Sequence, residues 1–190
     1  MLLFFEEILN IEIEVRILDI DIEDIRKKLF EHNAVLVKKE NQINKLFDFE
    51  DGRLLNSKGY ARIRIIEDLI SNESSFYMTV KKKISSNNDK YKIMDEKEIK
   101  ISDSFVGEEI FKSLGLRMTC LINRYRESYK IFDVLVEIDV NDKSFYPNPY
   151  IEIEGNCTKN IEKVVNILGY SMEDTTSKSI FDILKERNKN

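Results

Sequence analysis

Charged and apolar residues alternate one by one in many separate stretches of this chain. The clearest is Ile11 to Leu18, which reads Ile-Glu-Ile-Glu-Val-Arg-Ile-Leu. Successive side chains of a β-strand point to opposite faces, so a period of two predicts strands and not helices. Further strands are expected at Ala61 to Ile66, Phe76 to Lys83, Glu96 to Ile101, Ile122 to Lys130, Leu135 to Val140 and Tyr150 to Glu154, with Val35 to Asn44 and Leu46 to Phe49 as another strand or a hairpin arm.

Four segments instead repeat apolar residues with the spacing of an amphipathic helix. Asp21 can cap the first of them, and Gly115 and Gly169 stand just past the second and third, where glycine is favoured. The helices are expected after Asp21, over Ser104 to Leu114, from Thr158, and over Ser177 to about Arg187. The chain is therefore mainly β, with amphipathic helices beside the strands.

A sheet of many antiparallel strands has unpaired edges, and closing it into a barrel removes them. We therefore expect a closed barrel, with an open twisted sheet carrying helices on one face as the alternative. The length of 190 residues suits one domain. Residues 11–190 are assigned to that domain, and residues 1–10 to an N-terminal extension that packs on it.

The polar positions of the strands are almost all ionic. A sheet with one solvated face also alternates, and for any single strand that is the simpler interpretation. Here the charges segregate into acidic and basic pairs, which favours an inward-facing set with the apolar residues covered by helices. The acidic pairs are Glu12 with Glu14, Glu96 with Glu98, Glu137 with Asp139 and Glu152 with Glu154; the basic pairs are Arg62 with Arg64, Lys81 with Lys83 and Arg124 with Arg126, and Arg16 follows Glu14.

The outward residues in this arrangement would be Ile13, Val15, Ile63, Val80, Ile138 and Ile153. Lys82 and Lys97 do not fit it and are expected where the helical cover ends.

Unpaired charges inside a barrel would be costly, so each must meet an opposite charge, a metal ion or a bound polyanion. Carboxylate oxygens suit Mg²⁺ or Mn²⁺, and arginine forks match phosphate oxygens. The candidate metal ligands are Glu12, Glu14, Asp139, Glu152 and Glu154. The candidate phosphate ligands are Arg16, Arg62, Arg64, Lys81, Arg124 and Arg126. Metal ligands and phosphate ligands in one site are typical of enzymes that catalyse phosphoryl or nucleotidyl transfer.

These motifs, in this order, resemble the CYTH family, also called triphosphate tunnel metalloenzymes. The ExExK hallmark is matched by Glu12 to Arg16, with arginine in place of lysine, and the other matches follow along the chain. They are Gln42 and Asp48, the turn Asp51 to Leu55, Arg62-Ile63-Arg64, Lys81, Glu96-Lys97-Glu98, Arg124-Tyr125-Arg126, Asp139 and Glu152-Ile153-Glu154. Leu46 and Phe47 replace a tyrosine usual in the second strand, and Met94 replaces a frequent arginine.

The resemblance implies a closed eight-stranded antiparallel β-barrel enclosing a triphosphate tunnel. It also implies the metal and triphosphate ligands given above, with Mg²⁺ or Mn²⁺ as cofactor. The working hypothesis is a hydrolase of inorganic, nucleoside or thiamine triphosphate in which Lys81 and Arg64 are catalytic. An adenylate cyclase that makes cyclic AMP and pyrophosphate is the first alternative, and a non-catalytic polyphosphate- or nucleotide-binding module is the second.

Composition limits the partners. The net charge of −5 and the lack of a basic arm argue against nucleic acid. No stretch approaches the ~20 apolar residues that span a bilayer, and no signal peptide is expected. Cys120 and Cys157 lie outside any Cys/His cluster, and the chain has one histidine, His32. A cytoplasmic protein with reduced cysteines and a small-molecule triphosphate partner is expected, and a homodimer is left open.

Overall fold

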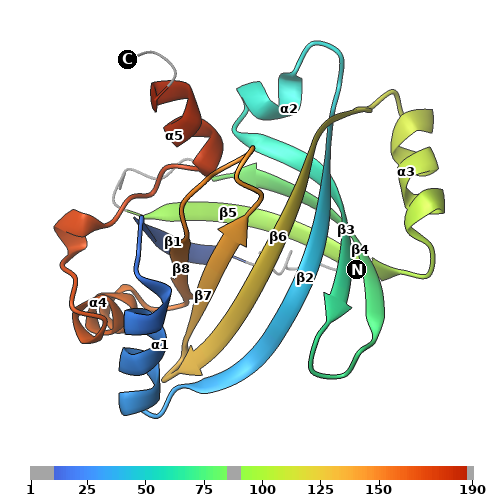
Figure 1. The fold of residues 1–190 in the computed structure, drawn as a ribbon. Helices are drawn as coiled ribbons and strands as arrows, with labels where there is room; N and C mark the ends of the chain where they lie inside the picture. Colours follow the sequence, from blue (N-terminus) through green and yellow to red (C-terminus); the bar gives the residue numbers. More distant parts are fainter. Residues whose placement is uncertain (1–10, 85–90, 188–190) are drawn as a thin grey trace, which may run out of the picture.

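The computed structural model describes residues 11–84 and 91–187, apart from the side chains of residues 11 and 12. The expected extension over residues 1–10 lies outside this part. Eight antiparallel strands form a closed barrel in the order β1-β5-β4-β3-β2-β6-β7-β8, with β8 pairing back to β1 (Figure 1). The predicted eight-stranded closed barrel is confirmed.

The strands are β1 (Ile11–Leu18), β2 (Val35–Asp48), β3 (Gly59–Asp68), β4 (Ser74–Lys83), β5 (Lys92–Ile101), β6 (Arg117–Ile131), β7 (Val134–Asn141) and β8 (Tyr150–Gly155). Each predicted strand is present. The two segments expected as a strand or hairpin arm are one strand, β2, whose pairing with β6 shifts register between Leu36 and Lys38 and again between Leu46 and Phe47. Such irregularities let a long strand bend around a barrel.

The helices are α1 (Ile22–Glu31), α2 (Arg53–Asn56), α3 (Ser104–Ser113), α4 (Thr158–Ile167) and α5 (Ile180–Arg187), with a 3₁₀ turn at Met172–Asp174. Asp21 accepts hydrogen bonds from the first amides of α1, as predicted. Gly115 and Gly169 have φ of +89° and +82° just past α3 and α4, which explains why glycine stands there. The prediction missed α2 and the 3₁₀ turn, and it began α5 three residues early.

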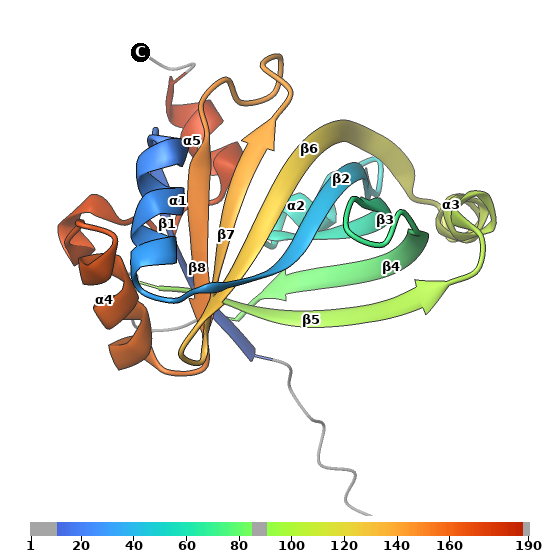
Figure 2. The same cartoon turned by 60° about the horizontal axis from the view of Figure 1, so that its bottom comes forward.

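The main apolar core lies outside the barrel, between its wall and two helices. Figures 1 and 2 show α1 and α4 side by side against β1, β8 and β7. Val15, Ile138 and Ile153 point outward from those strands and are fully buried under the helices. The predicted inversion, with apolar residues outside and charges inside, is therefore confirmed on this side of the barrel.

A second cluster joins α3 to β2 and β3. Ile63 is fully buried there, and Phe111 of α3 contacts Phe47 at a ring separation of 5.2 Å. Beyond α3, none of the helices in the described residues covers the outer face of β4 and β5 (Figure 2). The prediction that Val80 is covered is wrong, because its side chain is 42% exposed. Lys82 and Lys97 are exposed on the same bare face, as expected for residues beyond the helical cover.

The described cysteines, Cys120 and Cys157, are both free. His32 is the exposed C-cap residue of α1. No helix within residues 11–84 and 91–187 combines the length and apolar character needed to cross a lipid bilayer.

A buried carboxylate fastens α1 to the barrel wall. Glu127 points outward from β6, is 3% exposed, and accepts hydrogen bonds from Arg26 of α1 at 2.8 and 3.0 Å. The hydroxyls of Tyr125 and Tyr129 also donate to it. Burial alone raises the pKa of Glu127, but these donors outweigh burial, and the net pKa is lowered.

We expect Glu127→Gln to lower the free energy of unfolding at pH 7 by about 2 kcal/mol, because a charge-assisted acceptor of three side chains is lost. A carboxylate whose folded pKa is depressed stabilises the fold above its unfolded pKa, and that contribution disappears as pH falls through the folded pKa. Denaturant titrations at pH 7 and near pH 3 measure this. A difference between wild type and variant that does not shrink at the acid pH would contradict the role assigned to the charge.

Candidate triphosphate-binding tunnel

The barrel encloses a cavity of about 250 Å³ that is lined mainly by charged side chains. The cations are Arg16, Lys38, Arg62, Arg64, Lys81, Lys92, Arg124 and Arg126, and the carboxylates are Glu14, Glu96, Glu98, Glu137, Glu152 and Glu154. They come from all eight strands, and all of them except Lys38 and Lys92 stand at positions that the period-two pattern placed on the charged faces. The six predicted phosphate ligands all line this cavity.

Arg126 is the centre of the most densely paired region of the cavity. Its guanidinium donates to Asp139 at 2.6 Å through two nitrogens, to Glu152 at 2.9 Å, and to Glu137. Burial alone lowers the pKa of Arg126, but the charges of Asp139 and Glu137 outweigh it and keep the pKa above its usual value. Asp139 is 0% exposed and also accepts from Arg124 at 2.7 Å. This group is therefore a closed set of compensated charges.

Arg16 joins β1 to β8 and to the segment before α5. Its guanidinium donates to Glu14 at 2.6 Å, to Glu152 at 2.7 Å, and to the backbone carbonyl of Lys178 at 2.9 Å. Lys92 of β5 reaches the same Glu14 oxygen at 2.7 Å. The backbones of Arg16 and Thr176 also exchange hydrogen bonds of 2.8 and 2.9 Å. The arginine in place of the expected lysine therefore reaches three groups at separate points.

On the opposite wall, Arg62 lies near two carboxylates at longer range. Its terminal nitrogen is 3.4 Å from Glu96 and 3.3 Å from Glu98, and its Nε is buried without a hydrogen-bond partner. Lys81 pairs with Glu96 at 2.7 Å. Thr79 donates to Glu98 at 2.6 Å. Glu96 is thus shared between Arg62 and Lys81, and Glu98 between Arg62 and Thr79.

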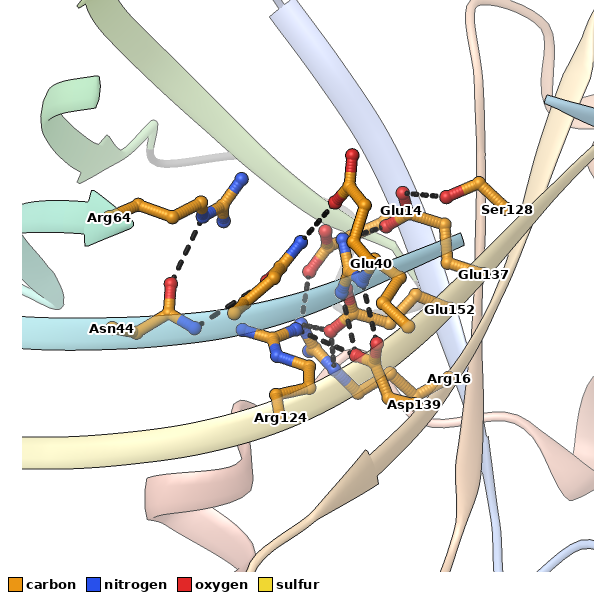
Figure 3. A network of polar contacts seen from close by, with 12 residues as sticks. Glu14, Arg16, Glu40, Asn44, Arg64, Arg124, Ser128, Glu137, Asp139 and Glu152 are labelled. Atoms are coloured by element: carbon orange, nitrogen blue, oxygen red, sulfur yellow. Dashed lines mark hydrogen bonds and ion pairs between the residues drawn. The ribbon is translucent and has the colours of Figure 1, made fainter. Parts of the chain in front are cut away.

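Arg64 differs from the other arginines of the cavity. Its Nε donates to the amide oxygen of Asn44 at 3.0 Å, and no carboxylate among the described residues lies within ion-pair distance (Figure 3). Burial and the charges of Arg62, Arg124 and Arg126 lower the pKa of Arg64 to about 9. A buried cation among other cations is unfavourable unless an anion binds there. Arg64 therefore marks where the cavity lacks negative charge.

The same positive charges change the pKa of Tyr60. Burial alone raises the pKa of its phenol, yet the charges of Arg62, Lys81 and Lys92 outweigh burial, and the net pKa is lowered. Arg124 adds a second unsatisfied donor, because its Nε is also buried without a partner. Among the described residues, the buried Nε atoms of Arg62 and Arg124 thus have no hydrogen-bond partner, and the guanidinium of Arg64 has no acid partner.

Glu154 lies in the opposite environment. Burial and the charges of Glu137, Glu14 and Glu152 raise its pKa to about 7, and Lys81 offsets this only in part. A divalent cation would relieve this repulsion, so the donor set fits a hard metal ion. In the described part of the chain no three acidic, histidine or cysteine groups converge as they would around a bound metal, because Glu14 and Glu152 turn toward Arg16.

The other predicted metal ligands are placed differently. Asp139 lies behind Arg124 and Arg126 and does not line the cavity itself. Glu12 occupies the β1 position opposite Met94, and its side chain is outside the described part. Asp48, matched to a family motif, instead caps α2 by accepting from the amides of Leu54 and Leu55 at 3.0 and 2.9 Å.

The sequence analysis missed several charged or polar residues of the cavity, among them Lys38, Lys92, Asn44 and Tyr150. Lys92 shares the inward face of β5 with Glu96 and Glu98, so the period of two could have found it had the strand been started earlier. Asn44 carries no charge, and only the approach of Arg64 shows its role.

Comparison with known proteins agrees with this geometry. The CYTH domain family matches residues 10–180, which is most of the chain, so the protein belongs to the CYTH domain family, whose members include enzymes that act on triphosphates. A search of the curated proteins finds no match.

Solved structures share the fold. The PH1012 protein of Pyrococcus horikoshii superposes with a TM-score of 0.74 at 25% identity, over 90% of this chain and 98% of that one. A candidate adenylate cyclase of Vibrio parahaemolyticus gives 0.73 at 10% identity, over 92% and 97% of the two chains. The Hippeastrum protein HpAC1, described as a candidate adenylyl cyclase with a dominant triphosphatase activity, gives 0.66 at 17% identity, over 93% and 95%.

The contrast between Arg64 and Arg126 gives a test. We expect Arg64→Gln to leave the free energy of unfolding within about 1 kcal/mol of wild type or to raise it, because it removes an uncompensated buried charge. The same variant should weaken binding of inorganic triphosphate roughly tenfold to a hundredfold. Denaturant titration and calorimetry measure the two effects.

Arg126→Gln is the matched control. It leaves Asp139 and Glu137 buried without their main partner, and we expect a loss of about 3 kcal/mol or more in stability. Equal destabilisation by the two substitutions would show that Arg64 is compensated in the same way as Arg126.

Proposed function

We propose that this protein is a metal-dependent phosphohydrolase that cleaves triphosphates inside the barrel. The observation that carries the proposal is the uncompensated positive charge at Arg64, which lies beside Arg62, Arg124 and Arg126 in an enclosed cavity. A polyanion of several phosphate groups can contact several such cations at once, because arginine binds phosphate oxygens through paired N–H donors.

In this proposal, phosphate oxygens of the triphosphate replace protein groups as the hydrogen-bond partners of the cations. Arg64 takes the first phosphate oxygens, since it gives up only a hydrogen bond to the neutral amide of Asn44. Lys81 and Arg62 then turn from Glu96 toward the ligand. Held in this way, Lys81 and Arg64 stabilise the charge that develops on the transferred phosphoryl group, which is the main catalytic contribution a protein makes to this reaction.

Mg²⁺ or Mn²⁺ is the proposed cofactor, with Glu14, Glu152 and Glu154 as ligands and Glu12 and Asp139 as further candidates. The support is the mutual repulsion that raises the pKa of Glu154. When bound, such an ion supplies charge to phosphate oxygens and lowers the pKa of water. Phosphate groups that recruit Arg16 would free Glu14 and Glu152 to turn toward the ion.

Two observations on relatives bear on the reaction. The Vibrio structure is described as a candidate adenylate cyclase, and HpAC1 as a candidate cyclase in which triphosphatase activity dominates. Cyclisation of ATP uses the same cations and metal ligands, so it is the second candidate. The HpAC1 description supports placing hydrolysis first.

Incubation of the pure protein with Mn²⁺ or Mg²⁺ and either inorganic triphosphate or ATP tests the proposal. We expect release of inorganic phosphate that stops when a chelator removes the metal. Cyclic AMP and pyrophosphate as the main products would favour the cyclase. Tight binding without any product would favour a non-catalytic binding module.

Glu154→Gln tests the metal site. We expect metal-dependent phosphate release to fall by at least a hundredfold, while the free energy of unfolding at pH 7 stays equal or rises because a source of acidic repulsion is gone. Glu109→Gln, an exposed carboxylate on α3, is the matched control and should change neither quantity. Full activity of Glu154→Gln at the wild-type metal concentration would remove Glu154 from the site.

A further inference from the structure

A row of three polar side chains on β2 leads to Arg64. Glu40, Gln42 and Asn44 alternate along the strand, so they share its inward face, and they are 7%, 2% and 1% exposed. Asn44 stands opposite Arg64 in the register of β2 and β3, and Figure 3 shows their side chains turned toward each other. Glu40, Gln42 and Asn44 are here called the polar row.

The hydrogen bonds of the polar row all run in one direction. The Nε of Arg64 donates to the Oδ1 of Asn44 at 3.0 Å. The Nδ2 of Asn44 donates to the Oε1 of Gln42 at 3.5 Å, and the Nε2 of Gln42 donates to the Oε2 of Glu40 at 2.6 Å. The row therefore connects the guanidinium of Arg64 to a buried carboxylate through two neutral amides.

The two ends of this chain of bonds decide how the amides between them are turned. A carboxylate only accepts hydrogen bonds, and a guanidinium only donates them. Gln42 must therefore turn its NH2 group to Glu40, which leaves its oxygen for Asn44. Asn44 in turn gives its NH2 group to Gln42 and its oxygen to Arg64. The opposite orientation would set oxygen against carboxylate at one end and N–H against N–H at the other, so Glu40 fixes which atom Asn44 presents to Arg64.

This arrangement leaves the terminal nitrogens of Arg64 free for a ligand. Among the described residues, only its Nε has a hydrogen-bond partner. Asn44 and Arg64 line the cavity, whereas Glu40 and Gln42 lie outside the set of lining side chains. An arginine that is already held loses less rotamer freedom when it binds a ligand. The polar row can therefore prepare Arg64 for phosphate, although its first two members do not face the phosphate.

We propose that Glu40 and Gln42 are positioning residues, which act through Asn44 to hold the guanidinium of Arg64 with both terminal nitrogens free for phosphate. The inference rests on the function proposed above and adds a buried negative charge that favours the binding of an anion. Charge alone predicts the reverse, because a carboxylate near the cavity repels phosphate. In the described part of the chain no cation lies within ion-pair distance of Glu40, so compensation of a neighbouring cation does not explain its burial.

Calorimetry with inorganic triphosphate, in the presence of a chelator, tests the role of Glu40. We expect Glu40→Gln to raise the Kd about fivefold, which corresponds to about 1 kcal/mol, because an amide at this position can turn either way and no longer fixes Gln42 and Asn44. An unchanged or lower Kd would overturn the inference and leave the proposed hydrolase intact. Failure of the wild-type protein to bind triphosphate would instead overturn the proposed function.

Glu67→Gln is the matched control. Glu67 is an exposed carboxylate of β3 that accepts from the amide of Asn41 at 3.0 Å, on the outer side of the same two strands. We expect its Kd to equal that of wild type. An equal rise in Kd for Glu67→Gln would show that any such loss of charge weakens binding, and would overturn the assignment to the polar row.

Exchanging two side chains of the row separates positioning from folding. The double variant Glu40→Gln/Gln42→Glu keeps the composition and net charge of the wild type. Its carboxylate at position 42 accepts directly from the NH2 group of Asn44, so the oxygen of Asn44 still faces Arg64. We expect the exchange to restore the Kd to within about twofold of wild type. A double variant that binds as weakly as Glu40→Gln would overturn the inference.

A double-mutant cycle tests whether Glu40 acts through Arg64. Once Arg64→Gln has been introduced, Glu40→Gln should change the Kd by less than about twofold, because two residues that act through one contact are not additive. The same loss in both backgrounds would give Glu40 a general structural role and overturn its assignment as a positioning residue.

Discussion

The mutual compensation of buried charges inside the barrel is the constraint on which the rest of this structure depends. Arg126 holds Asp139, Glu137 and Glu152 in one cluster, and Glu152 connects that cluster to Arg16. Any of these groups alone would oppose folding. Together they fix the register of adjacent strands, because a shift of one residue would turn a charged face into the apolar layer under α1 and α4.

The same compensation makes its exceptions informative. Most of the cavity is neutralised by the protein itself, so the places where it is not are few and localised. Arg64 lacks an acid within reach among the described residues, and Glu154 has acids around it. The uncompensated cation at Arg64 is complementary to the negative phosphate groups of a metal-bound triphosphate, and the surplus of acids at Glu154 is complementary to the metal ion. A cavity with every charge paired would have offered much weaker grounds for a function.

Much of the fold could be predicted because period-two alternation constrains every strand, and glycine and aspartate mark the helix ends. The closed barrel, the inward charges and the outward Val15 and Ile153 all follow from that pattern. Val80 was misplaced because the pattern gives the face of a residue but not the extent of its cover. The role of Asp48 was missed because a capping carboxylate and a ligand carboxylate have the same sequence signal. Which acid pairs with which arginine depends on side-chain reach across the lumen, and no strand pattern encodes it.

The link between Arg16 and the carbonyl of Lys178 has a consequence for the C-terminal segment. The guanidinium contacts Glu14, Glu152 and this carbonyl, so a ligand that attracts it must compete with all three. Arg187 secures the other end of α5 through Asp19 and the hydroxyl of Tyr146. The chain before α5 is thus tied to β1 through Arg16, by its backbone at Thr176 and by its side chain at the carbonyl of Lys178. A ligand that drew Arg16 away from this carbonyl would favour local opening of the segment, and by linkage opening would favour binding of that ligand by the same factor.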